Sequence, residues 1–203
     1  MSCSCDNNPL ILPVGATGPQ GPQGPKGDPG TPAFQHYIGE SFGGGVVFHV
    51  YRDALGVERG LIASIINQDL AKDVYSNIDN VACGALSTWD GQSNTNLIKT
   101  QAGPSGSGAW KLCDDYTVTV GSTTYNDWYL PSVDELNLLY NNRFNTNKTL
   151  ATLVGANQLV YESYWTSSEY SAASAFVFSF QFGTSNYNGP KGFLYNVRAI
   201  RKF

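Results

Sequence analysis

Apolar runs and alternations predict the strands of this 203-residue chain. Residues 44–52 and 60–66 are rich in β-branched residues and flank a turn glycine, which predicts a β-hairpin. Near the C-terminus Phe176, Phe178, Phe180 and Phe182 alternate with other residues, so a strand there would place all four on one side. We expect a small hairpin at 117–125, a long polar turn at 182–192 and a last strand within 192–203.

Helical periodicity predicts two helices. The first follows Asn94 and ends near Gly103, or resumes through residues 109–116, where apolar residues recur at i, i+3, i+4 and i+7. The second begins at Ser132, which forms a capping box with Glu135. Its apolar face comprises Val133, Leu136, Leu139 and Tyr140. The pattern predicts an α+β fold with short antiparallel sheets, two helices and a long loop at 67–93.

A different pattern occupies residues 15–32, where glycine recurs at every third position. The glycines are Gly15, Gly18, Gly21, Gly24, Gly27 and Gly30. Only glycine fits at the axis of three wound polyproline-II chains, so the run predicts a collagen-like stalk and hence a homotrimer. At roughly 3 Å per residue the stalk would be about 50 Å long. A flexible Pro/Gly linker is the alternative.

The stalk divides the chain into expected parts. Residues 1–14 would be an N-terminal anchor peptide, 15–32 the stalk, 33–37 a linker and 38–203 a globular head. Because six triplets are too few to hold three chains together alone, we expect the head or the N-terminal peptide to clamp them. Residues 1–14 lack the basic and apolar regions of a signal peptide, so we expect no export by that route.

Composition and charge exclude several functions. The net charge is −4 and only 14% of residues are charged, which excludes a polyanion-wrapping basic protein, so we expect no nucleic-acid partner. No stretch reaches the roughly 18 apolar residues of a membrane span. The sequence is compatible with a disulfide bond between Cys83 and Cys113. The alternative is that both are free thiols in a reducing compartment.

Catalytic motifs are absent from the sequence, and we expect no enzyme and no cofactor. Of the two histidines, His36 lies in the linker and His49 in the middle of a predicted strand. There is no nucleophile elbow or zinc-protease motif. The glycine triplet before Val46 lacks the lysine of a phosphate loop. Acidic pairs such as Asp114–Asp115 do not follow an EF-hand spacing, so calcium is unsupported.

Three motifs in fixed order carry a family resemblance. They are "YNDWYLPSVDELNLLY" (125–140), "YWTSSEYSAASAF" (164–176) and the closing "YNVRAIRKF" (195–203). With "GGGVVFHV" and "AWKLCDDY" upstream, residues 38–203 resemble the C-terminal domain family of bacterial collagen-like adhesins. That resemblance implies a C-type-lectin-like head that is trimeric and binds surface glycans, often anionic ones. Formylglycine-generating enzymes are related in shape, but no cysteine follows Cys113 here.

The resemblance identifies no ligand residues in this sequence, so candidates come from the loops. Tyrosine offers large contact area at low entropic cost, which suits weak glycan recognition. We expect Tyr170, Tyr187, Asn188 and Lys191, which flank the phenylalanine strand, to contact the ligand. Trp128 and Trp165 are interpreted as buried scaffold, and Arg198 and Arg201 as structural partners of Glu135 or Glu169.

A fibre assembled without a signal peptide fits a phage virion best. Residues 1–14 would then attach the trimer to a capsid or tail protein, and the head would bind a host cell-surface glycan. A spore-surface filament and a bacterial adhesin are alternative settings. A passive structural or decoration protein, with no ligand, is the alternative function.

Overall fold

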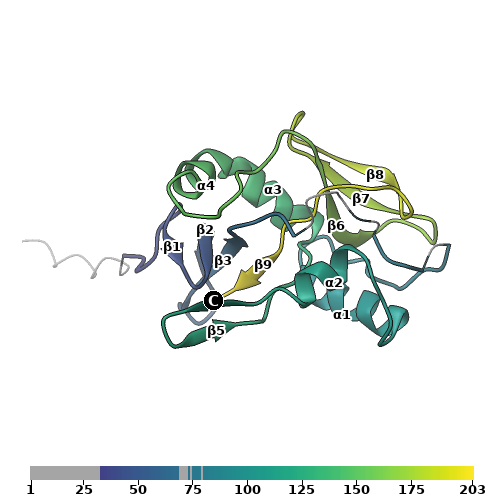
Figure 1. The fold of residues 1–203 in the computed structure, drawn as a ribbon, viewed down its shortest axis with the longest axis horizontal. Helices are drawn as coiled ribbons and strands as arrows, with labels where there is room; N and C mark the ends of the chain where they lie inside the picture. The colour runs from purple at the N-terminus through teal and green to yellow at the C-terminus, as the bar shows by residue number, and fades with distance from the viewer. Residues whose placement is uncertain (1–32, 69–72, 74, 79) are drawn as a thin grey trace, which may run out of the picture. The chain divides into compact units, whose positions relative to one another are not determined.

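The structure is a computed structural model that describes residues 33–68, 73, 75–78 and 80–203, and for Tyr187 only the backbone (Figure 1). The predicted anchor and collagen-like stalk lie outside the described residues. Within the described part the fold is mixed α+β with antiparallel sheets, as the pattern predicts. Its helices are α1 (Gly91–Ala102), α2 (Ala109–Asp114), α3 (Val133–Asn141) and α4 (Arg143–Leu150).

A four-stranded antiparallel sheet has the order β1-β2-β3-β9. Its strands are β1 (Ser41–Phe42), β2 (Gly45–Arg52), β3 (Glu58–Ser64) and β9 (Ile200–Lys202). The predicted hairpin is confirmed as β2 and β3, with a bulge between Val47 and His49. The predicted last strand is much shorter than expected, because only residues 200–202 pair with β3. Helices α3 and α4 pack against β2 (Figure 1).

The glycine triplet makes the turn from β1 into β2. Gly43 and Gly44 have φ values of 58° and 84°, in the left-handed region that favours glycine. A Cβ on Gly45 would overlap the carbonyl of Ala63 on the neighbouring strand. The triplet therefore serves a tight turn and a close approach of two strands.

A three-stranded sheet has the order β6-β7-β8. Its strands are β6 (Ser163–Glu169), β7 (Ser174–Ser179) and β8 (Thr184–Pro190). The prediction of a polar turn over 182–192 is wrong, because most of that segment forms β8 and pairs with β7. The expected row of four phenylalanines is also only partly right. Phe178 and Phe180 are buried, but the chain turns after Ser179 and leaves Phe182 72% exposed.

The helices differ from the prediction in number and in one boundary. Asp90 caps α1, which begins three residues before Asn94 and ends before Gly103. The apolar repeat at 109–116 forms a separate short helix, α2, and the capping box of Ser132 and Glu135 at α3 is confirmed. Helix α4 was not expected. The predicted hairpin at 117–125 is confirmed as β4 (Val118–Val120) and β5 (Thr123–Tyr125).

The core contains the predicted scaffold residues. Trp128 and Trp165 are 2% and 0% exposed, so their assignment as scaffold is confirmed. Arg198 is fully buried, but it donates to the carbonyls of Ser64, Asn157 and Gln158 rather than to a glutamate. Arg201 pairs with Asp127 at 2.7 Å. The expected pairing of these arginines with Glu135 or Glu169 is therefore wrong.

Candidate functional site

Of the four residues predicted to contact a ligand, the structure exposes Tyr170 and Asn188 and buries Lys191. Tyr170 follows β6, is 54% exposed and meets the ring of Phe176 edge-on. Asn188 is exposed in β8, and Tyr187 is its neighbour in the same strand. Lys191 follows β8 but is only 1% exposed.

The expectation of an exposed, ligand-contacting Lys191 is wrong because its ammonium group lies in the interior. Lys191 Nζ lies 2.5 Å from Glu169 Oε1 and 3.0 Å from the carbonyl oxygen of Val81. Glu169 also accepts hydrogen bonds from the backbone amides of Cys83 and Gly84. A charge with these partners serves the fold and cannot reach a ligand at the surface.

A more suitable surface lies beside α4, and we call it the Arg143 cleft. Its volume is about 390 Å³. Its lining residues are Arg143, Phe144, Asn147, Lys148, Gln158 and Tyr161. Phe144 and Tyr161 are large aromatic side chains, yet they are 75% and 69% exposed. Exposed aromatic side chains beside a cleft are typical of binding surfaces.

Helix α4 sets the spacing of this cleft. Residues four apart lie above one another on a helix, so Arg143 stands over Asn147 and Phe144 over Lys148. The side chain of Asn147 accepts a hydrogen bond from the Leu159 amide at 2.7 Å and donates to the Leu159 carbonyl at 3.4 Å. This contact holds the segment that carries Gln158 and Tyr161 against the helix, so both walls of the cleft are fixed.

Positive charge is concentrated in the Arg143 cleft, although the chain as a whole has a net charge of −4. Its lining contains two cations and no carboxylate, and neither cation forms an ion pair with a described residue. Arg143 donates one hydrogen bond to the Tyr140 carbonyl at 2.8 Å and stacks 3.8 Å above the Tyr140 ring. The remaining donors of a guanidinium are suited to a carboxylate or sulfate group.

Metal and thiol chemistry find little support in the described part of the chain. No group of three or more His, Cys, Asp or Glu side chains is arranged there to hold a metal ion. Cys83 and Cys113 are free thiols, and Cys113 is buried. Burial raises the pKa of both thiols, so neither is activated as a nucleophile.

A mixed α+β domain that carries a cationic, aromatic cleft and follows a Gly-X-Y run has the features of an attachment domain. A sequence model of the Lcl C-terminal domain, found in collagen-like adhesins, matches residues 85–201. The match covers more than half of the chain, and the chain belongs to this family. It is a family of adhesin-type domains and not an enzyme family. No curated protein matches the sequence significantly.

Among the described residues, none of the helices has the length and apolar character needed to span a bilayer.

Proposed function

We propose that this chain forms a homotrimeric surface fibre whose head binds anionic saccharides of a cell surface through the Arg143 cleft. The observation that carries the proposal is the coexistence of two cations that pair with no described carboxylate and two exposed aromatic rings in one cleft of an adhesin-family domain. Aromatic rings would cover the apolar face of a sugar ring, and the cations would bind its carboxylate or sulfate group.

Trimerisation follows from the Gly-X-Y run at residues 15–32 and makes weak sites effective. Three linked sites gain about 10²–10⁴ in avidity over one site when all three engage together. Under this proposal residues 38–203 are a C-type-lectin-like head, residues 33–37 a linker and residues 1–14 an anchor. The fibre is mounted on a phage capsid or tail, with a spore or bacterial surface as the alternative setting.

A binding measurement with two related polymers tests the proposal. The full-length protein is passed over immobilised dextran sulfate and over neutral dextran. We expect binding to dextran sulfate only, because the neutral polymer offers nothing to the two cations. Arg143→Gln with Lys148→Gln removes two charge-assisted contacts, each worth about a factor of ten, so binding weakens by roughly 100-fold.

The matched control removes two cations elsewhere. Arg59→Gln with Lys111→Gln makes the same change in net charge, at residues whose cations pair with Asp53 and Asp115. If this control weakens binding as much as the cleft variant, the attraction is a general effect of charge and the cleft is not the site. If neither polymer binds, and an array of sulfated and uronic-acid glycans is also silent, the chain is a passive decoration protein.

A further inference from the structure

Trp89 stands apart from the other tryptophans of this chain. Its side chain is 71% exposed, whereas Trp110, Trp128 and Trp165 are at most 2% exposed. It lies two residues before the start of α1. A lone exposed apolar residue needs no explanation in itself. What distinguishes Trp89 is the rigidity of the segment that holds it and the cleft that it lines.

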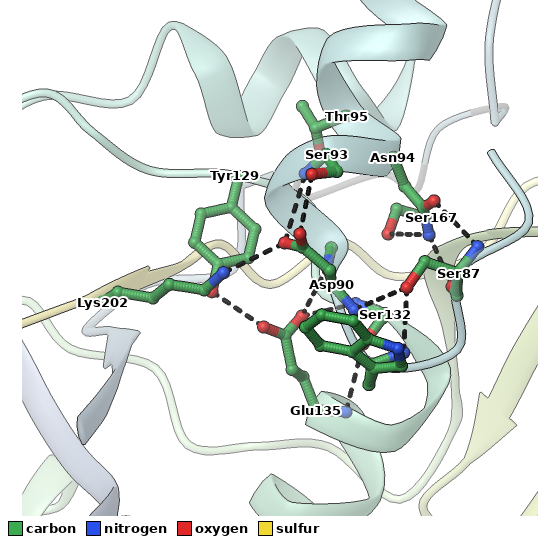
Figure 2. A network of polar contacts seen from close by, with 12 residues as sticks. Ser87, Asp90, Ser93, Asn94, Thr95, Tyr129, Ser132, Glu135, Ser167 and Lys202 are labelled. Atoms are coloured by element: carbon green, nitrogen blue, oxygen red, sulfur yellow. Dashed lines mark hydrogen bonds and ion pairs between the residues drawn. The ribbon is translucent and has the colours of Figure 1, made fainter. Parts of the chain in front are cut away.

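The backbone on both sides of Trp89 is fixed by hydrogen bonds, several of which are drawn in Figure 2. Ser87 Oγ accepts from the amides of Trp89 and Asp90 at 3.3 and 2.9 Å. The Ser87 carbonyl accepts from Asn94 Nδ2 at 2.7 Å and from Ser168 Oγ at 2.8 Å. The tryptophan is therefore presented to solvent from a preorganised segment, which lowers the entropic cost of binding a ligand.

One buried carboxylate fixes the floor of the same region. Glu135 accepts from the amides of Ser132 at 2.8 Å and Gly91 at 3.1 Å, and from the Tyr129 hydroxyl at 2.8 Å (Figure 2). The first residue of α1 is thus joined to the start of α3. Burial raises the pKa of Glu135, although the hydrogen bonds from Ser132 and Tyr129 favour its charged form. Three hydrogen bonds therefore engage the carboxylate within this network.

The cleft lined by Trp89, which we call the Trp89 cleft, has a volume of about 330 Å³. Its lining residues are His49, Tyr51, Leu61, Trp89, Asp134, Glu135, Leu138 and Lys202. Tyr51 is 40% exposed and its ring stacks on His49, with centroids 5.6 Å apart and planes at 23°. The cleft therefore combines two exposed aromatic rings with apolar side chains.

The charge of the Trp89 cleft is opposite to that of the Arg143 cleft. Lys202 is the one lysine of its lining, and its ammonium lies 3.0 Å from Asp90 Oδ1 and 5.4 Å from the centre of the Tyr129 ring. This ion pair compensates the charge of Lys202. Asp134 is exposed and forms no ion pair with a described residue. An exposed carboxylate thus remains beside the rings.

We propose that the Trp89 cleft is a second binding site, which accepts an organic ammonium group between Trp89, Tyr51 and Asp134. The faces of aromatic rings attract cations, tryptophan most strongly, and this attraction is the usual means of recognising quaternary ammonium groups. The carboxylate of Asp134 adds charge complementarity. The site differs from the Arg143 cleft in its lining residues and in the sign of the ligand charge. The two proposed sites can therefore be tested independently of each other.

Tryptophan emission offers a direct test on the full-length protein, since Trp89 is the exposed one of the four tryptophans. Choline chloride is titrated at constant ionic strength against 3,3-dimethylbutan-1-ol, which has the same shape without the charge. We expect choline to change the emission in a saturable way and the neutral alcohol to bind at least tenfold more weakly. Equal affinity of the two would overturn the proposal.

Variants locate the site. Asp134→Asn should raise the choline dissociation constant roughly fivefold, the value of one Coulomb contact near 4 Å in water. Trp89→Ala should abolish binding, measured by the line width of the choline methyl protons, which does not depend on Trp89 emission. Asp115→Asn removes the same charge at an exposed carboxylate outside the Trp89 cleft, and this matched control should leave choline binding unchanged. Unchanged binding by Trp89→Ala would also overturn the proposal.

Two further probes identify the source of the ammonium group. Glucosamine, which is protonated, is compared with neutral N-acetylglucosamine, and vesicles of phosphatidylcholine are compared with vesicles of phosphatidylglycerol. Preference for glucosamine supports an amino-sugar polymer as ligand, and preference for phosphatidylcholine supports a lipid headgroup. Equal binding of both members in both pairs contradicts recognition of an ammonium group.

Discussion

The ammonium group of Lys191 lies 2.5 Å from the carboxylate of Glu169, and both side chains are 1% exposed. Glu169 is the last residue of β6, and Lys191 directly follows β8. The pair therefore joins the ends of two strands that are not neighbours in their sheet. Through the amides of Cys83 and Gly84 it also fixes the segment that leads toward α1.

Replacing Lys191 should destabilise the head strongly. Lys191→Met leaves the Glu169 carboxylate buried without its counter-charge, and the loss of one partner of a buried pair costs about 3–5 kcal/mol. Urea unfolding followed by circular dichroism measures this change. The double variant Lys191→Met with Glu169→Gln removes both charges and should recover a large part of the loss. A single variant as stable as the wild type would show that the pair is not needed.

The same pair predicts a dependence of stability on pH. Burial alone would raise the pKa of Glu169, but Lys191 and the amides of Cys83 and Gly84 outweigh it and hold the pKa below the ordinary value of 4.5. A carboxyl with a lowered pKa in the folded state stabilises the fold above pH 4.5, and this contribution is lost as the pH falls through the lowered pKa. In urea unfolding between pH 7 and 3, Glu169→Gln should show a smaller loss of stability in acid than the wild type. Equal losses would contradict this assignment.

The capping box at α3 offers a test that does not involve a charge pair. Ser132→Ala removes the hydroxyl that accepts from the Glu135 amide at 3.4 Å, and such a change costs about 1 kcal/mol. The effect is measured by thermal unfolding. Ser122→Ala, in the exposed turn between β4 and β5, is the control and should leave the melting temperature unchanged. Equal melting temperatures for both variants would mean that the cap does not limit the stability of the head.

The stalk is tested by a substitution at its expected axis. Under the proposed trimer, Gly24→Ala places a methyl group where only glycine fits and should lower the melting temperature of the triple helix. The unfolding of the head should not change, because the described hydrophobic core lies within residues 42–203. Circular dichroism separates the two transitions, and light scattering measures the mass. A monomeric wild-type chain, or unchanged stalk melting in the variant, would contradict the triple helix.

The sequence predicted those elements whose signal is local. Three features follow from short sequence patterns that agree with the tertiary structure. They are the capping box at Ser132, the hairpin of β2 and β3, and the burial of Trp128 and Trp165. Strand β8 was missed because its residues are polar and rich in glycine and asparagine. It pairs with β7 as the third strand of its sheet through backbone hydrogen bonds, and a pattern of hydrophobic side chains cannot predict such bonds.

The candidate sites were harder to predict than the fold. Lys191 follows a polar segment typical of loops, and only the fold shows that Glu169 meets it in the interior. The Arg143 cleft depends on a helix with weak apolar periodicity, α4, and on Tyr161 from the segment that follows. Phe144 and Lys148 are four residues apart in the sequence, and this spacing could have predicted that they lie on the same face of a helix. Nothing local indicates that Trp89 would be exposed while the other tryptophans are buried.

The pairing of β9 with β3 also has a consequence for how the head is made. Residues 200–202 complete a sheet whose other strands all lie within residues 41–64, so the contact joins the two ends of the domain. Phe203 adds to it by packing edge-on against His36 and Phe42. During synthesis β3 therefore cannot pair with β9 until nearly the whole domain has been translated. Such distant pairing slows folding. Under the proposed trimer, three growing chains therefore have time to associate through their Gly-X-Y runs before any of their heads has closed.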